Sequence, residues 1–427
     1  MTTTGRGPRP ALPPVYEAFL PREHALYRPR HGRSQLVALI CAIVFLATPG
    51  LSAVAGARPS QFENRALTPF PSFGQGWSFF PQFTRWATDH LVFREQAVHA
   101  ADGISRGVFG EPPPLNQENQ QNPLQVPVPA PDSPKYDRRQ FPNVIEGKSG
   151  WLYLGDEVTS HCVQASNLDT TFAQLRSFRD GIEASGRQLV VVVAPDKVGM
   201  VPQYLPDNYV GKDCHDAIEG DFWRRVDAEN FMIDPRRPIQ DWANRKGAPV
   251  YGPQDAHWSD EGAISAVRAV VEKLRPGISA GWRIQPKEDW QVPADLPPLI
   301  GRTGQTEGTH YALMPDGTTD RTRPMPADYI PPVHTDTATG EGTYGLRTAW
   351  LGDSFTIRTL PYLAATFRDL TALHTSTADH DGGAAAADLL QRSDVVVIEL
   401  AERGLVVGSV SMLSPAVQQN IFTKLAR

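Results

Sequence analysis

The sequence predicts an α/β fold, in which a doubly wound parallel sheet carries helices on both faces and a single transmembrane helix precedes it. Residues 188–194 (QLVVVVA) form a continuous apolar, β-branched run, which is typical of a strand buried on both faces. From about residue 141, strand and helix patterns alternate, and this alternation favours a parallel sheet. An uncharged segment over residues 36–57 predicts the membrane-crossing helix.

The composition limits the functional class and the domain organisation. The net charge of -6 excludes the strongly basic surface that is typical of a nucleic-acid partner. The 39 prolines are concentrated in the first thirty residues and in the segment 111–134. We therefore expect four regions, which are a basic, proline-rich cytoplasmic tail (1–35), a transmembrane anchor (36–57), a stalk helix with a proline-rich linker (58–140), and a main domain (141–427) with a long loop insertion near 277–343.

The uncharged segment 36–57 is long enough to cross a bilayer at about 1.5 Å per residue. Several arginines and only two glutamates precede it, so the positive-inside rule predicts a cytoplasmic N-terminus and an exported main domain, in the periplasm or at the cell exterior. A cleaved signal peptide is the alternative, because the small residues at 53–57 resemble a cleavage site, but the leader is longer than a usual n-region. A buried soluble helix is disfavoured by Pro49 and Gly50.

Export also affects the interpretation of the cysteines. Cys41 lies in the expected anchor, which leaves Cys162 and Cys214 as a pair in an oxidising compartment, where a disulfide is the usual state. The neighbouring His161 and His215 could complete a metal site. Adjacent ligands lack the usual C-x2-4-C spacing, so the sequence favours the disulfide and no metal.

The first half of the main domain is predicted from apolar spacing. A helix over 170–184, for example, has Phe172, Leu175 and Phe178 on one face. The expected elements are, in order, a strand at 151–154, the helix at 170–184, the strand at 188–194, a helix around 222–223, a short apolar segment at 231–234, a helix at 239–245 and a strand at 249–251.

The second half begins with a helix opened by Ser259, Asp260 and Glu261, since acidic residues favour the positive end of a helix. Glycine and proline are frequent over 277–343 and periodicity is weak there, which predicts the loop insertion. The remaining expected elements are a strand at 346–351, helices at 360–367 and 384–390, a strand at 395–400 and a last helix at 415–426.

Two short segments carry the residues of a nucleophilic site, Asp255-Ala256-His257 and Gly352-Asp353-Ser354. A serine hydroxyl needs a base, and the base needs an orienting carboxylate. In an extended segment residues i and i+2 project to the same side, so Asp255 can reach one ring nitrogen of His257 while the other meets Ser354. This arrangement predicts a hydrolase or an acyltransferase.

The expected position of these residues supports the combination. Sites in parallel sheets form at the carboxyl ends of strands, and Asp255 and Ser354 each follow an expected strand. The turn that contains Asp353 would expose the serine, whose own N–H can stabilise an oxyanion. Each residue alone has an ordinary interpretation, as a turn serine, a loop histidine or a solvated aspartate. Only the combination favours a catalytic triad.

At these residues the chain resembles the AlgJ/AlgX-type polysaccharide O-acetyltransferases, whose catalytic domain is similar to the SGNH hydrolases with its motifs in permuted order. The aspartate and histidine accordingly precede the serine. The resembling residues are Glu63-Asn64-Arg65, Asp89-His90, Phe93-Arg94, residues 147–153, 194–197 and 204–206, Asp255-Ala256-His257-Trp258, Gly352-Asp353-Ser354-Phe355, and Glu399 with Glu402 and Arg403.

The resemblance implies that Ser354 takes an acetyl group as an ester and passes it to a polysaccharide hydroxyl, with His257 as base, Asp255 as orienter and no cofactor. It also implies a multi-pass MBOAT-type membrane acyltransferase as the source of the acetyl group. No room remains after Arg427 for the C-terminal carbohydrate-binding module of AlgX, so the expected likeness is closer to AlgJ, and the acceptor polysaccharide stays open.

Secondary candidates are Trp258, Lys197, Glu399 and Arg403. Trp258 could stack on a sugar ring or lie in the core beneath the loop. Lys197 could face the site or the solvent, and Arg403 could form a rim ion pair with Glu402. Two other functions remain open from the sequence, a carbohydrate acetylesterase with the same triad and a non-catalytic polysaccharide-binding or scaffold subunit.

Overall fold

The computed structural model describes residues 33–57, 70–71, 79–92, 96–97, 100, 103–104, 136–337 and 339–426. These residues divide between two compact units, of which the first contains helix α1 and the second contains the main domain. The expected tail up to residue 32, the motif Glu63-Asn64-Arg65, the pair Phe93-Arg94 and the proline-rich segment 111–134 lie outside the described residues.

Helix α1 (Arg33–Val54) covers most of the segment expected as the anchor. Within the described residues, we find no helix with the length and apolar character needed to cross a membrane. Helix α2 (Phe79–Asp89) falls in the expected stalk. Its aromatic side chains cluster with Phe70, whose ring centroid is 5.0 Å from that of Trp86.

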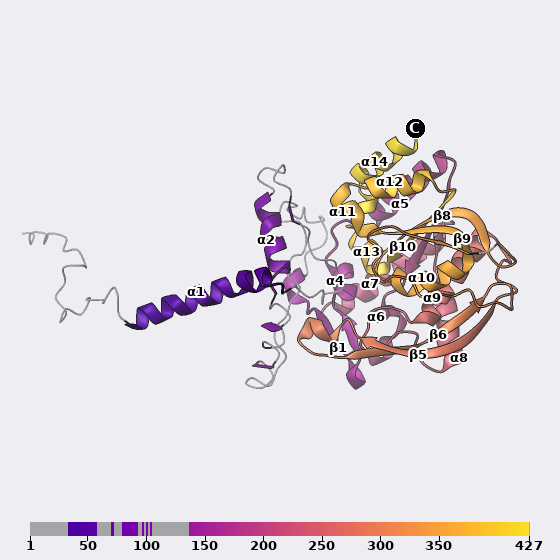
Figure 1. Ribbon diagram of the computed structural model, residues 1–427. Coiled ribbons are helices and arrows are strands. Elements are labelled where there is room, and N and C mark those ends of the chain that lie inside the picture. Colours follow the sequence, from indigo (N-terminus) through magenta and orange to yellow (C-terminus); the bar gives the residue numbers. More distant parts are fainter. Residues whose placement is uncertain are drawn as a thin grey trace, which may run out of the picture. The chain divides into compact units, whose positions relative to one another are not determined.

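The main domain is built on a six-stranded sheet in the order β4-β3-β10-β8-β9-β7 (Figure 1). Neighbouring strands are parallel except at the β7 edge, where β7 runs antiparallel to β9. The expectation of a wholly parallel sheet is therefore wrong at this edge. The strands are β3 (Gln188–Ala194), β4 (Met232–Ile233), β7 (Val333–Asp336), β8 (Tyr344–Gly352), β9 (Phe367–His374) and β10 (Val395–Ala401).

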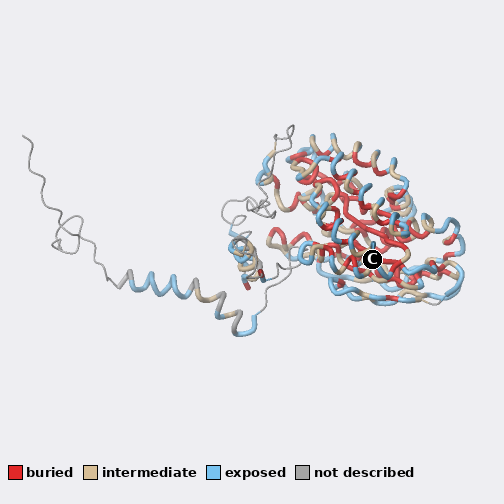
Figure 2. The backbone as a smooth tube through the Cα atoms, turned by 90° about the horizontal axis from the view of Figure 1, so that it is seen from above, coloured by how far each residue is buried: buried red, intermediate tan, exposed pale blue. Residues whose placement is uncertain are grey.

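Helices cover both faces of this sheet, as the sequence predicted. Val190 and Val192 of β3 face one apolar core, whereas Val191 and Val193 face the other. Figure 1 shows α9 (Asp260–Leu274) and α10 (Thr356–Thr366) on one side, and α5 (Leu168–Ala184), α12 (Ala384–Gln391) and α14 (Pro415–Leu425) on the other. Figure 2 shows that the buried backbone runs through the interior of the main domain, while the exposed backbone lies toward its outside.

Further elements surround the sheet. Strands β1 (Val144–Glu146) and β2 (Leu152–Leu154) pair antiparallel. The other helices are α4 (Asp156–Cys162), α6 (Lys197–Met200), α7 (Lys212–Ala228), α8 (Arg236–Lys246), α11 (Ala378–Asp381) and α13 (Glu402–Val407).

The expected loop insertion contains regular structure. Strands β5 (Arg283–Pro293) and β6 (Gln305–Met314) form an antiparallel ribbon, and Trp290 Nε1 donates to Asp260 Oδ2 of α9 at 2.8 Å. Most residues of β5 are exposed, so its sequence lacks the apolar alternation that identifies a half-buried strand.

The strand expected at 249–251 is not part of the sheet, and this prediction is corrected. Tyr251 forms only an isolated antiparallel bridge with Trp258. Pro249 and Pro253 lack the backbone N–H that a sheet strand must donate, which limits pairing here. Asp255 therefore follows no sheet strand and lies in the loop between α8 and α9.

Candidate active site

The turn that presents Ser354 begins at the carboxyl end of β8, as expected. A Cβ on Gly352 would lie 1.9 Å from Thr356 Oγ1, so only glycine allows this close approach. Asp353 Oδ1 accepts the Phe355 N–H at 3.0 Å, and its Oδ2 accepts the Ala401 N–H of β10 at 2.7 Å. Asp353 thus fixes the turn to the neighbouring strand, while Ser354 remains half-buried.

The structure brings Asp255, His257 and Ser354 together. His257 Nε2 lies 2.9 Å from Ser354 Oγ, and Nδ1 lies 2.9 Å from Asp255 Oδ1. Asp255 Oδ1 also accepts the His257 backbone N–H at 2.9 Å. When the carboxylate is ionised it can only accept, so Nδ1 carries the proton and the neutral ring leaves Nε2 as the acceptor for the serine hydroxyl.

A second carboxylate, which the sequence did not reveal, also contacts this imidazole. Asp295 Oδ2 lies 3.1 Å from His257 Nδ1, and Asp295 Oδ1 accepts the Ala256 N–H at 3.1 Å. Asp295 belongs to the segment expected as a loop insertion. A single aspartate in a proline-rich segment has no periodicity or motif spacing, so no sequence signal could have identified it.

The two carboxylates control the charge of His257. Burial alone would lower the pKa of His257, but its hydrogen bonds to Asp255 and Asp295 outweigh this effect and raise the pKa to about 10. Burial acts to raise the pKa of Asp255, yet the hydrogen bonds from His257 bring it below its usual value. The pKa of Asp295 is raised, first by burial and then by the charge of Asp255. His257 therefore has to lose a proton before it acts as a base.

Lys197 lies beneath the loop that carries Asp255. It is fully buried and faces neither the solvent nor an open site. Its Nζ donates to the carbonyl oxygens of Leu152, Gly252, Pro253 and Asp255 at 2.7, 2.6, 3.0 and 3.0 Å. Burial lowers the pKa of Lys197 to about 8, against the opposing charges of nearby carboxylates. Its contacts indicate a role in holding the loop.

Trp258 lies in the core beneath the loop. Its side chain is only 1% exposed, so the ring cannot stack on a sugar. Trp258 Nε1 donates to the Phe355 carbonyl oxygen at 3.2 Å, and the two ring centroids are 4.9 Å apart. Trp258 therefore joins the segment of the base to the segment of the nucleophile.

The rim ion pair considered for Arg403 and Glu402 is absent from the described contacts, and this interpretation is corrected. Arg403 Nη1 pairs with the buried Asp196 at 2.7 Å. Glu402 is also buried and accepts from Trp223 Nε1 at 2.9 Å. Both side chains therefore stabilise the interior behind the site, because the strand–helix junction after β10 turns them inward.

Glu399 is fully buried in β10 and accepts the hydroxyl of Thr356. The same Thr356 oxygen accepts from Trp350 Nε1 at 2.9 Å. Burial, followed by the charge of Asp353, raises the pKa of Glu399 well above its ordinary value. Glu399 thus supports the first turn after Ser354 from the interior of the domain.

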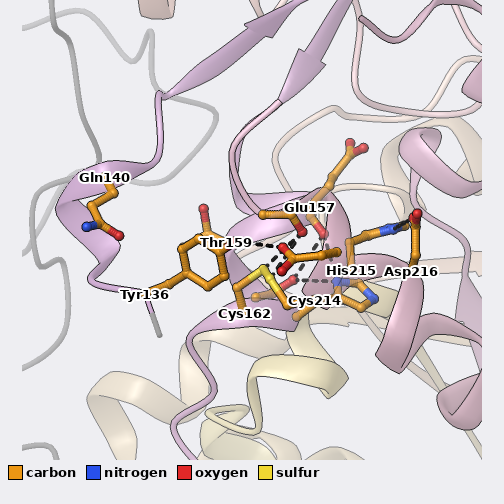
Figure 3. Close-up of a disulfide and its surroundings, with 12 residues drawn as sticks. Tyr136, Gln140, Glu157, Thr159, Cys162, Cys214, His215 and Asp216 are labelled. Atoms are coloured by element: carbon orange, nitrogen blue, oxygen red, sulfur yellow. Dashed lines mark hydrogen bonds and ion pairs between the residues drawn. A yellow bond between two sulfur atoms is a disulfide. The ribbon is translucent and has the colours of Figure 1, made fainter. Parts of the chain in front are cut away.

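The structure joins Cys162 of α4 to Cys214 of α7 in a disulfide with a Cα–Cα distance of 5.3 Å (Figure 3). His161 Nδ1 lies 2.8 Å from the Glu157 carbonyl oxygen, and His215 Nδ1 lies 3.4 Å from Asp216 Oδ1. Because the sulfurs are bonded to each other, they are not available as the thiolates that a zinc site requires.

Among the described residues, one group of acidic and histidine side chains is close enough together for a cation. The oxygens of Asp255 and Asp295 and the Nδ1 of His257 lie within 4.8 Å of one another. Both carboxylate oxygens lie within hydrogen-bond distance of His257 Nδ1. Its ring N–H can therefore hold them together without a cation. We therefore treat this group as a hydrogen-bonded array.

Comparison with known proteins supports the resemblance. Residues 144–331 match the model of a family described as the SGNH hydrolase-like domain of the acetyltransferase AlgX. This match includes Asp255, His257 and Asp295 and ends before Ser354. A protein named "Probable alginate O-acetylase AlgJ" from Pseudomonas fluorescens is 29% identical over 134 residues, which are 31% of this chain and 34% of the relative. The proteins of the same name from P. syringae pv. tomato and P. aeruginosa are 28% and 27% identical, over 30% and 31% of this chain and 32% and 34% of their own lengths.

The chain thus spans about a third of the length of the curated relatives that it matches. Among solved structures, the O-acetyltransferase domain of Pseudomonas putida AlgJ is 18% identical with a TM-score of 0.43, covering 67% of this chain and all of that one. Bacillus cereus PatB1 with a sulfonyl adduct is 13% identical with a TM-score of 0.43, covering 62% of this chain and 98% of that one.

Proposed function

We propose that this chain, whose residues 144–331 match the SGNH hydrolase-like domain of the acetyltransferase AlgX, transfers acetyl groups to polysaccharide hydroxyls through an ester on Ser354. The observation that carries the proposal is the hydrogen-bonded series from carboxylate to imidazole to serine. Its two central distances are 2.9 Å each, between Asp255 Oδ1 and His257 Nδ1 and between His257 Nε2 and Ser354 Oγ.

In the first half-reaction, Ser354 Oγ attacks the acetyl carbonyl carbon of a donor ester while its proton moves to His257 Nε2. The resulting oxyanion is stabilised by backbone N–H groups, of which the N–H of Ser354 is our candidate. The bond between the carbonyl carbon and the donor oxygen then breaks. The leaving oxygen takes the proton from His257, and the acetyl group remains on Ser354.

In the second half-reaction, a sugar hydroxyl attacks the acetyl-serine. His257 accepts the hydroxyl proton and returns it to Ser354 Oγ as the ester bond to the enzyme breaks. If water replaces the sugar, the product is acetate and the same residues act as an acetylesterase. The triad geometry favours both enzymatic functions over a non-catalytic scaffold, since a scaffold has no need of an aligned base and nucleophile.

The proposed setting is the outer side of a membrane. The uncharged segment 36–57 would anchor the chain with its N-terminus in the cytoplasm. A multi-pass MBOAT-type acyltransferase would supply the acetyl group, and the acceptor would be a cell-surface or secreted polysaccharide. The sequence supports the anchor, and the family resemblance supports the donor and the acceptor. The proposed reaction uses no cofactor.

The test is acetyl transfer by the Ser354→Ala variant. Full-length protein is incubated with 4-nitrophenyl acetate and a panel of neutral and uronate oligosaccharides, and the sugars are weighed by mass spectrometry. We expect acetylated sugar and an acetylated Ser354 peptide from the wild type. The variant should lose at least about a thousandfold in rate at an unchanged melting temperature, because the nucleophile is removed.

The exposed Ser409→Ala variant is the matched control and should keep full activity. Acetate without acetylated sugar would favour the acetylesterase. Undiminished transfer by Ser354→Ala would contradict both enzymatic functions.

A further inference from the structure

We propose that Asp295 is a second positioning carboxylate for His257 and that, together with Asp255, it sets the pH range in which His257 can act as a base. This inference rests on the proposed function for its role in the reaction. Its structural basis is the placement of one imidazole between two carboxylates from segments far apart in the chain.

The contacts of Asp295 divide between its two oxygens. Oδ2 lies 3.1 Å from His257 Nδ1, and Oδ1 accepts the Ala256 N–H at 3.1 Å. A residue that served only to hold the loop would need the second of these contacts alone. The first contact faces the ring nitrogen on the side opposite Ser354, which is where an orienting carboxylate acts in a triad.

Asp255 presents one oxygen to two N–H groups of His257. Its Oδ1 contacts both His257 Nδ1 and the His257 backbone N–H, each at 2.9 Å. Asp295 adds an independent oxygen, and the side chains of Asp255 and Asp295 are only 15% and 16% exposed. Water therefore screens neither carboxylate well, and both charges act on the imidazole.

The charged groups around this array are distributed over several elements. Lys197 of α6 contacts the Asp255 carbonyl oxygen at 3.0 Å, and Arg358 of α10 lowers the pKa of Asp255. Arg403 of α13 lies 5.3 Å from the Phe355 ring, whose centroid is 4.9 Å from that of His257. Ser354 is the neutral group at Nε2. The charge of Asp295 acts on Lys197 as well as on His257, and on both side chains it favours the protonated form.

The sign of the effect follows from these charges. A nearby negative charge favours the imidazolium, so removing the charge of Asp295 should lower the pKa of His257 and free the base at lower pH. Asp295→Asn keeps an oxygen for the Ala256 N–H while it removes the charge. We expect the His257 titration midpoint to fall by about one to three pH units, as for the loss of an opposite charge at this distance.

The direct experiment is nuclear magnetic resonance of the full-length protein with histidine ring nitrogens labelled with nitrogen-15. A His257→Gln variant assigns the resonance, and the wild type is titrated beside Asp295→Asn. The exposed Glu288→Gln variant, from the same inserted segment, is the control for a lost carboxylate without this contact. A midpoint that falls in Asp295→Asn and stays in Glu288→Gln supports the inference. Equal midpoints in all three proteins overturn it.

Kinetics separate this inference from the proposed function. The acid limb of the pH profile for acetyl-ester turnover should move to lower pH in Asp295→Asn by the same amount as the titration midpoint, with a reduced plateau rate because the ring is less well held. If the His257 titration midpoint shifts but the protein has no acetyl-ester turnover, the result supports the Asp295–His257 contact and contradicts the proposed function. If turnover depends on Ser354 but the acid limb of the pH profile does not shift, the result supports the proposed function and contradicts the inference.

If the Asp295→Asn protein does not fold, two further measurements still test the inference. Asp295→Glu keeps the charge and should retain the alkaline midpoint of the wild type. The wild-type titration is informative by itself, since a midpoint near the ordinary histidine value of about 6.5 would overturn the inference.

Discussion

At the scale of single residues, Lys197 shows how a buried charge can order a loop without entering the chemistry. Its ammonium group has three N–H donors, and four carbonyl oxygens lie within 3.0 Å of it. Three of these oxygens belong to the segment 252–255, directly before His257. The Gly252 and Pro253 oxygens also accept the backbone N–H groups of Asp255 and Leu152, so Lys197 adds a charged donor to a loop that is already tied to β2.

We therefore predict that Lys197→Met lowers the free energy of unfolding by about 3 kcal/mol, because the loop loses its hydrogen bonds from a buried charged group. Acetyl-ester turnover should also fall, since the loop that positions Asp255 loses its support. Urea unfolding and steady-state kinetics measure the two effects. The exposed Lys212→Met variant is the control and should change stability by less than about 0.5 kcal/mol. A Lys197→Met protein as stable as the wild type would contradict the assigned role.

The residue scale also shows how far the sequence could predict the site. Asp255 and His257 are two positions apart, and Ser354 lies in a short turn after an apolar strand, so local patterns identified all three. Asp295 is separated from His257 by a helix and a strand, and its contact depends on how the β5–β6 segment folds back. The orientation of Trp258 and Lys197 depends on packing, which a single sequence does not specify.

At the scale of elements, the disulfide fastens two helices that lie behind the site. Cys162 and Cys214 are 52 residues apart in sequence, and α4 and α7 are in contact. Helix α4 also carries Glu157, whose Oε2 accepts the Val198 N–H of α6 at 2.9 Å. The disulfide therefore holds α4, and α4 in turn contacts α6, the helix that carries Lys197.

We predict that replacing both cysteines of the pair by serine lowers the free energy of unfolding by about 4 kcal/mol, because the unfolded chain regains the entropy of an open loop of this length. Urea unfolding measures the change, and the rate per folded molecule should stay close to that of the wild type. Cys41→Ser provides the control for loss of a thiol. Equal stability of the double variant and the wild type under oxidising conditions would show that the disulfide has no such role.

The same scale separates elements that the sequence could predict from those that it could not. The strand at 188–194 is buried on both faces, and its continuous apolar run is typical of such a strand. Its expected bounds agree with those of β3. The ribbon strand β5 is largely exposed and has the opposite pattern. Tyr251 pairs through a single bridge, so a short apolar segment there resembled a strand without forming one.

At the scale of the whole molecule, the alternation of strands and helices was enough to predict a layered α/β domain. It could not predict the antiparallel edge strand β7, since β7 has four residues and lies in a segment without clear periodicity. It also could not show that the ends of β3, β8 and β10 carry Asp196, Ser354 and Glu402 to one edge, because strand order is a property of the assembled sheet.

We predict that the full-length protein fractionates with membranes and that a variant without residues 33–57 is released from them, as expected for a chain held by one apolar segment. The measurement is fractionation after an alkaline wash, combined with protease digestion of intact cells, which should remove the main domain only if it is exported. A mature protein that begins near residue 58 would instead indicate a cleaved signal peptide.

The short loop between Tyr251 and Trp258 has a mechanical consequence. It contains both the base and its partner Asp255, and the bridge between its two ends closes it. Any shift of this loop therefore carries Asp255 and His257 as one rigid piece, so the distance between them is conserved while the gap to Ser354 changes. Asp295 contacts His257 Nδ1 and the Ala256 N–H from outside the loop, so the same shift also changes the distance between this second carboxylate and the imidazole. A donor or an acceptor that presses on the loop would therefore change the basicity of His257 together with its distance to Ser354.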